Sequence, residues 1–334
     1  MDRANNQAGY TVLEVLLAAT LTVGLFGVVF SIVNRNQDVF VKESNVTEMN
    51  QNVRVAIDLL TRDIQSAGMG LPRASGSFAA IYYTDGASNS SDSLLILNGD
   101  PYAPTADVTD RAAGSAEFSC MLPPDVTATG NGANVEFTYL GGKGQPAPIY
   151  KSFATDPRYY LVYDDNRAMV MALSRDGMLT GPAGNQRLSL QHNPTSFSNP
   201  PTVFGTAMDA GEPDYASAKL AVLGSMVAYR VNDQTRELER TEDLTNWYSV
   251  ARGVTSLQVR YRVVSRDESG NIVETMTSMP TDRRSVRSVE VTISSETPDV
   301  LPSSRGYRQA VQRFETAPRN FNLLNNTNLS SNLN

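Results

Sequence analysis

The chain has 334 residues with 28 basic and 35 acidic side chains, which gives a net charge of −7. This length allows one large or two small folded domains beside a membrane segment. A mildly acidic chain with few lysines lacks the basic surface of a general nucleic-acid-binding protein, so we expect no nucleic-acid partner. The chain has one cysteine and one histidine, which excludes an intramolecular disulfide and a metal site of several histidines.

The first segment, 1–9, is polar and ends in Gly9. It is followed by Tyr10-Thr-Val-Leu-Glu14 and then by an almost purely apolar run that ends at Val33. A helix over these 24 residues, at about 1.5 Å per residue, is roughly 36 Å long and can cross the hydrocarbon core of a bilayer. We therefore expect a transmembrane helix over 10–34.

Glu14 is the one charged side chain between Arg3 and Arg35. A carboxylate near the membrane interior costs on the order of 3 kcal/mol, so its presence implies a partner charge. A secretory signal peptide would need a cleavage site after the apolar run, and no convincing Ala-x-Ala site follows Val33. A plain membrane anchor would have no use for Glu14.

The region 35–70 has the pattern of an amphipathic helix. Its apolar positions recur every three or four residues and form one stripe. They are Val46, Met49, Val53, Ile57, Leu60, Ile64 and Ala67. Gly68, Gly70 and Pro72 then end the helix. We expect one helix from Thr11 to Ala67, in which Val53, Ile57, Leu60 and Ile64 are buried under strands.

The region 71–319 is expected to be a β-rich globular domain, which makes the fold α+β. Alternating apolar residues predict strands over 93–97, 135–140, 159–163, 168–173, 220–231, 236–240, 257–263 and 289–293. Turn residues predict hairpins about 164–166, 232–233 and 268–271. The stretch 177–214 is expected to hold loops with one or two short strands, and the Asn-rich tail 320–334 to be mobile.

The segment Gly9-Tyr10-Thr11-Val12-Leu13-Glu14 resembles the class III signal of type IV prepilins. The resemblance implies that a prepilin peptidase cuts between Gly9 and Tyr10 and methylates the amino group of Tyr10. Glu14 would then be the fifth mature residue and would contact the α-amino group of Tyr10, on its own or an adjacent subunit. The chain departs from the family by having Tyr where Phe is usual and by a leader with one basic residue, Arg3, beside Asp2.

Four other segments resemble the PilW-like minor pilins and the related J-type pseudopilins of type II secretion systems. They are the helix end 52–68, the strand start Ser91-Asp-Ser-Leu-Leu-Ile96, the segments within 229–261, and the closing segment 314–320. The resemblance implies a pilin-like fold, in which a long N-terminal helix packs on a mainly antiparallel β domain. The stretch 100–215 matches no part of that pattern.

The function expected from this resemblance is a minor pilin that helps to initiate or cap a type IV pilus. Its partners would be the prepilin peptidase, other minor pilins, the major pilin and the inner-membrane assembly platform. The chain would cross the inner membrane once with an exported C-terminal domain, and then enter the filament or its tip. Two alternatives are a J-type pseudopilin, and an adhesin or DNA-capture module that would show a basic or aromatic exposed patch within 100–215.

Residues suited to catalysis or metal binding are few, and we expect no enzyme, cofactor or metal. Cys120 and His192 have the side chains of a nucleophile and a base, but a buried thiol and a loop imidazole explain them more simply. Asp267-Glu-Ser-Gly-Asn271 has the oxygen ligands of a calcium loop without its spacing and is better explained as a hairpin turn, and Asp164-Asp165 as another. The cluster of Arg283, Arg284 and Arg287 fits a solvated strand end or a partner's carboxylates, while Met169, Met171, Met276 and Met279 fit packing.

Overall fold

The structure is a computed structural model. It describes residues 11–71, 80–84, 90–110, 117–130, 134–164, 168–182, 186–192, 215–267, 269–278, 286–300 and 306–318. Residue contacts divide the chain into two units, 1–51 with 296–309 and 52–295 with 310–334. The expected leader 1–9 and tail 320–334 lie outside the described residues.

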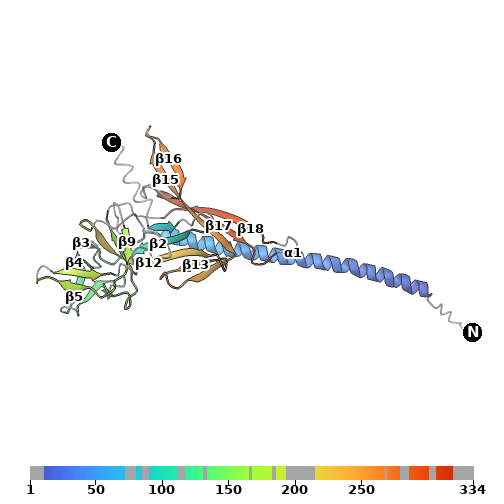
Figure 1. Cartoon of the computed structure of the whole chain (residues 1–334), viewed down its shortest axis with the longest axis horizontal. Coiled ribbons are helices and arrows are strands. Elements are labelled where there is room, and N and C mark those ends of the chain that lie inside the picture. Colours follow the sequence, from blue (N-terminus) through green and yellow to red (C-terminus); the bar gives the residue numbers. More distant parts are fainter. Residues whose placement is uncertain are drawn as a thin grey trace, which may run out of the picture. The chain divides into compact units, whose positions relative to one another are not determined.

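One long helix, α1 (Val12–Ser66), precedes the strands and confirms the predicted helix to within one residue at each end (Figure 1). It ends because Gly68 and Gly70 both have φ of +75°, which is the left-handed region that favours glycine. A Cβ at Gly70 would lie 2.5 Å from the carbonyl oxygen of Gly99. The Gly68 amide also donates to the Leu97 carbonyl at 2.8 Å, so the helix stop is fixed against the strand that contains Leu97.

The rest of the described chain is built of strands, and the class is therefore α+β. The strands in the first half are β1 (Ile81–Thr84), β2 (Ser93–Gly99), β3 (Ala106–Asp110), β4 (Glu117–Met121), β5 (Val126–Thr129), β6 (Glu136–Leu140), β7 (Pro146–Ile149), β8 (Tyr160–Tyr163) and β9 (Ala168–Met171). Those in the second half are β10 (Met178–Thr180), β11 (Arg187–Gln191), β12 (Lys219–Asn232), β13 (Glu237–Thr241), β14 (Tyr248–Arg252), β15 (Val254–Arg266), β16 (Ile272–Thr277), β17 (Val286–Glu296) and β18 (Gln309–Thr316).

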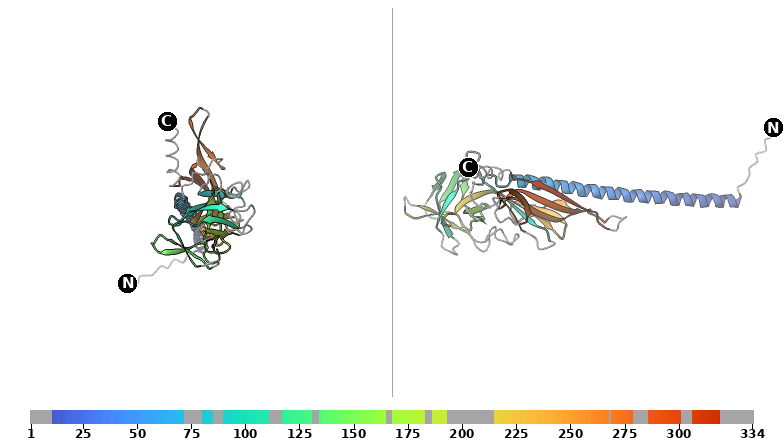
Figure 2. Two further views of the ribbon diagram at one scale, coloured as in Figure 1. Left: turned by 90° about the vertical axis from the view of Figure 1, so that its left-hand side faces the viewer. Right: turned by 90° about the horizontal axis from the view of Figure 1, so that it is seen from above.

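These strands form three sheets. An 11-stranded sheet is centred on β12, which pairs antiparallel with β2, β3, β8 and β13. A four-stranded sheet has the order β16-β15-β17-β18, and a three-stranded sheet has the order β5-β6-β7. In the second unit, the strands coloured green gather beyond Ser66, where α1 ends (Figures 1 and 2).

Every strand predicted from the alternating pattern is present, and the hairpins β8–β9, β12–β13 and β15–β16 pair as expected. The described parts of the stretch 177–214 hold two short strands, β10 and β11, whereas most of its second half lies outside the described residues. Several strands were missed, among them β3, β4, β5 and β7. They are only four or five residues long, and β7 contains Pro146 and Pro148, which argue against a strand when only the sequence is considered.

The end of α1 forms the centre of the first apolar core. Val53, Leu60 and Ile64 are completely buried against side chains of β2, β12, β15 and β17. Ile57, which was predicted to be buried, is only partly buried, and Ala56 lies in the core in its place. Ile57 lies at the border of the stripe, because positions 53, 56, 60, 64 and 67 follow the helical period more closely.

A buried polar contact fixes the rotation of α1 against the sheet. The Tyr229 hydroxyl donates to Asp63 Oδ2 at 2.5 Å, and Arg240 Nε donates to the same oxygen at 2.9 Å. Burial, followed by the bond to Asp63, raises the pKa of Tyr229, so the hydroxyl stays protonated and acts as the donor. Removing the Asp63 carboxylate would leave the hydroxyl of the buried Tyr229 without this acceptor, which is why the contact favours one packing of the helix.

Strand β12 connects this core to two others. Val227 and Tyr229 face the α1 core, while Met226 and Ala228 face a second core with Leu95. A third core contains Leu220 and Val222 of β12 with side chains from β4, β6, β8, β9 and β11. The alternation of side chains along one long strand therefore joins the packing of the α1 region to that of the strands beyond it.

The four-stranded sheet carries a charged cluster at its edge strand. Arg262 of β15 forms a bidentate pair with Glu315 of β18, with Nε–Oε1 and Nη2–Oε2 distances of 2.6 and 2.7 Å. Ser288 of β17 also donates to Glu315. The bonds from Arg262 and Ser288 lower the pKa of Glu315 to about 2, so this carboxylate favours the folded state most when it is ionised.

We predict that Leu60→Ala lowers the free energy of unfolding by about 2–5 kcal/mol, because it removes a completely buried side chain from the α1 core. The measurement is urea unfolding of a soluble fragment that begins at Arg35. Val55→Ala is the matched control, because Val55 is 48% exposed on the same helix and should change stability by less than about 0.5 kcal/mol. An unchanged midpoint for Leu60→Ala would show that this face does not form the core.

We predict a pH-dependent contribution from Glu315. Its folded pKa of about 2 lies below the unfolded value of about 4.3, so its stabilisation is complete above that pH and is lost as the pH falls towards 2. The difference in melting temperature between wild type and Glu315→Gln should be largest at neutral pH and shrink through this window. A difference in melting temperature that is the same at every pH would contradict the lowered pKa of Glu315.

Candidate functional site

The most unusual surface of this chain is the first half of α1. Every residue from Thr11 to Ser44 is exposed, including large apolar side chains such as Leu13, Leu17, Phe26 and Phe30. An apolar surface of this extent is not stable in water. By length and composition, α1 is the one helix in the described part of the chain that is long and apolar enough to cross a membrane.

Glu14 belongs to a capping box at the start of α1. The Thr11 amide and hydroxyl donate to Glu14 Oε2 at 3.1 and 3.2 Å, and the Glu14 amide donates to Thr11 Oγ1 at 3.3 Å. Such reciprocal bonds satisfy amides that a helix start otherwise leaves without partners. The negative carboxylate also lies at the positive end of the helix dipole. The sequence signal for this box, Thr-x-x-Glu at residues 11–14, was present but was not recognised in the sequence analysis.

The bonds of the capping box reach one of the two carboxylate oxygens. Both bonds from Thr11 reach Oε2, and no group among the described residues donates to Oε1. The capping box thus holds the carboxylate in the first helical turn through Oε2 alone, as far as the described residues show. Gly9 and Tyr10, which were predicted as the cleavage and methylation site, lie outside the described residues, so their geometry with Glu14 is not described.

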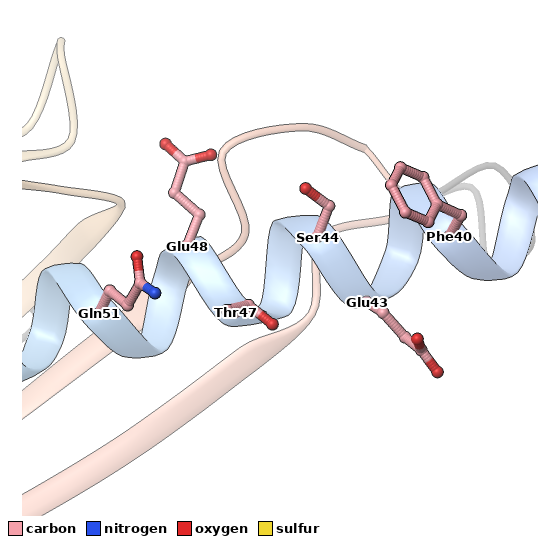
Figure 3. Close-up of a pocket in the computed structure, with 6 residues that line it drawn as sticks. All are labelled: Phe40, Glu43, Ser44, Thr47, Glu48 and Gln51. Atoms are coloured by element: carbon pink, nitrogen blue, oxygen red, sulfur yellow. The ribbon is translucent and has the colours of Figure 1, made fainter.

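A shallow groove follows the apolar run on the same helix. It is lined by Phe40, Glu43, Ser44, Thr47, Glu48 and Gln51, which project from the helix surface in Figure 3. Phe40 is 74% exposed. The groove contains two carboxylates and no basic side chain, so its lining is acidic.

Cys120 and His192 lie in the interior. Cys120 is completely buried, and His192 is not the loop imidazole that was expected, because it is 3% exposed and forms a β-bridge with Leu173. Burial, followed by the charge of Asp107, raises the pKa of the Cys120 thiol, which disfavours the thiolate that a nucleophile needs. No group of three or more His, Cys, Asp or Glu side chains in the described ranges could hold a metal ion.

The remaining residues singled out in the sequence have structural roles where they are described. Asp267 accepts bonds from the amides of Ser269 and Asn271, which confirms the hairpin turn. Met169 and Met171 are buried in the third core, as predicted for packing residues. Met276 and Arg287 are partly buried on β16 and β17. Asp165, Met279, Arg283 and Arg284 lie outside the described residues.

Ser91 and Asp92, which directly precede β2, have a role that the sequence did not reveal. The Leu257 amide of β15 donates to Ser91 Oγ at 2.7 Å, and the Val259 amide donates to Asp92 Oδ2 at 2.7 Å. These side chains thereby connect β2, which lies in the 11-stranded sheet, to β15 of the four-stranded sheet.

Comparisons with models of protein families, with curated proteins and with solved structures find no match to this chain. What the structure itself shows is one N-terminal helix that is long and apolar enough to span a membrane, followed by a mostly antiparallel β domain.

Proposed function

We propose that this chain is a minor pilin of the PilW-like kind that helps to initiate or cap a type IV pilus. One observation carries the proposal: a fully exposed apolar helix half bears a carboxylate in its first turn and continues, as one helix, into the core of a β domain. A membrane anchor alone needs the apolar run but neither the carboxylate nor the continuity. The prepilin-like segment Gly9–Glu14 supplies the rest of the argument.

The mechanism follows from the exposed half of α1. Before assembly, the residues from Val12 to Val33 would be dissolved in lipid, because apart from Glu14 and a few hydroxyl residues their side chains are apolar on every side of the helix. During assembly, this half would move into a bundle of helices from neighbouring subunits. Lipid contacts are then exchanged for helix packing, in which van der Waals contact and interhelical polar bonds replace the hydrophobic effect as the driving force.

Glu14 would set the register of that bundle. Its Oε2 is held by Thr11, and its Oε1, which no described residue contacts, would meet a cation such as the α-amino group of processed Tyr10 on the same or an adjacent subunit. In a low dielectric, such a pair orients its members, and leaving either charge unpaired costs several kcal/mol. The pair therefore selects one position of the helix more than it adds net stability.

The end of α1 is held firmly within the β domain. Val53, Leu60 and Ile64 are buried in the core, and the contact of Asp63 with Tyr229 and Arg240 fixes the rotation of this part of the helix. The large β domain favours a low-copy subunit, because a major pilin must repeat densely along the fibre.

We predict that Gly9→Leu leaves an uncleaved precursor in the membrane. A peptidase that acts at the membrane face needs a residue without a side chain at the bend before Tyr10. Mass spectrometry of the protein purified from cells should show the leader retained. Leu13→Ile, four residues beyond the cleavage site, is the matched control and should be processed normally. A normal mature mass for Gly9→Leu would refute the assignment of the cleavage site.

We predict that Glu14→Ala inserts into membranes at least as well as wild type, because it removes a cost of about 3 kcal/mol, yet fails to enter filaments. Glu14→Asp should give intermediate incorporation, because the charge remains but is one methylene shorter. Subunit counts in sheared filaments and crosslinking to other pilins in membranes measure the two steps separately.

Thr11→Val tests whether Glu14→Ala fails to enter filaments because the capping box is lost and not because the charge is lost. It removes the hydroxyl bonds to Glu14 but keeps the charge, so it should enter filaments better than Glu14→Ala. Undiminished incorporation of Glu14→Ala would show that the carboxylate is not the assembly contact.

A further inference from the structure

The four-stranded sheet ends on each side in a strand that has one neighbour. Among the described strands, β16 pairs with β15 alone and β18 with β17 alone. Neither edge strand contains a lysine or a proline, which are residues that commonly keep an edge from pairing with another chain. The hairpin of β15 and β16 extends beyond the end of β17, and the residues 272–275 of β16 are all exposed (Figure 1).

Contacts across the sheet show which side chains of the two edges share a face. Arg262 lies opposite both Met276 of β16 and Ser288 of β17, and residues opposite each other take the same face. Arg262 and Ser288 both donate to Glu315 of β18, which therefore belongs to that face as well. Because side chains alternate along a strand, this outer face carries residues 272, 274 and 276 of β16 and residues 311, 313 and 315 of β18.

The two edges are complementary in direction and in side chains. Because β16 and β18 run in opposite directions within the sheet, a second copy in the same orientation would bring its β18 antiparallel to β16. One register then matches charge with charge and apolar with apolar side chains. It pairs Glu274 with Arg313 and Met276 with Val311 on the outer face, and Val273 with Phe314 on the other face.

The neighbouring registers fit less well. When both copies keep the same face outward, the register changes in steps of two residues. One step places Glu274 opposite Glu315, and like charges in this position are destabilising. The other step places Glu274 opposite Val311 and Arg313 opposite Ile272, so neither charge has a counter-charge.

The two charged side chains are only loosely held within their own chain. Glu274 lies 3.5 Å from Arg262, and Arg313 lies 3.7 Å from Glu290. The side chains of Glu274 and Arg313 are 56% and 64% exposed, and ion pairs this long and exposed contribute little stability. Both side chains are therefore accessible to a charge on another copy.

We infer that this sheet pairs edge to edge with a second copy of the chain, with β16 of one copy against β18 of the other. Main-chain hydrogen bonds supply the contact, and the side-chain pattern sets its register. Because the two edges differ, each copy keeps one free edge after pairing, so the contact is head to tail and not two-fold. The inference does not depend on the proposed pilin role, and because two copies suffice, it is compatible with a low-copy subunit.

The test is cysteine crosslinking of the full-length protein in detergent micelles, with copper phenanthroline as the oxidant. Met276→Cys and Val311→Cys, prepared separately and mixed, should form a disulfide-linked dimer, because residues opposite each other have Cβ atoms about 5 Å apart. Ile272→Cys mixed with Val311→Cys is the matched control. Its cysteines would be about 13 Å apart along the strand, so it should give several times less dimer. The native Cys120 is completely buried and can remain.

A charge exchange tests the proposed pair separately. Glu274→Arg or Arg313→Glu, added to both cysteine variants, should reduce the dimer, because like charges would then face each other. The double variant Glu274→Arg/Arg313→Glu should restore it, whereas any effect on contacts within one copy would persist.

Three results would overturn the inference. They are the absence of dimer in the mixture of Met276→Cys with Val311→Cys, equal amounts of dimer in this mixture and the control, and a dimer formed by Met276→Cys alone. The last result would show that β16 pairs with β16.

Discussion

The continuity of α1 is the constraint on which the rest of the structure depends. One helix of 55 residues has an exposed apolar half with no covering partner in the described chain, and a later half whose stripe forms the centre of a β core. The first half is stable only in lipid or among other helices, whereas the second half is stable only when the β domain is folded around it.

The details of the β domain follow from the need to hold this helix. Paired glycines stop α1 against the strand end at Gly99, and Asp63 joins it to Tyr229 and Arg240. Ser91 and Asp92 connect the two sheets that contact it. Each of these contacts acts at short range and at a specific position. Together they favour a single orientation of the helix, whereas burial alone would allow several.

The sequence predicted the helix and the longer strands because their signals are periodic over many residues. The stripe from Val53 to Ile64 and the alternation in 220–231 and 257–263 are of this kind. The features that the sequence did not predict have local causes. Ala56, a small residue that gives little apolar signal, fills the place expected for Ile57, and β7 forms despite two prolines. The capping box was readable in Thr11-x-x-Glu14, whereas the edge positions of β16 and β18 depend on the strand order, which no local pattern shows.

The proposed assembly role requires that residues from Val12 to Val33 form a membrane helix without a partner in their own chain. Spin-label accessibility in proteoliposomes tests it directly, with single cysteines placed along 12–44; the native Cys120 is completely buried and can remain. We predict exposure to lipid-soluble oxygen on every side of the helix as far as Val33, followed by exposure to a water-soluble quencher from Arg35. Water exposure that recurs every three or four residues within 12–33 would contradict this account, because it would show an amphipathic helix and not a spanning one.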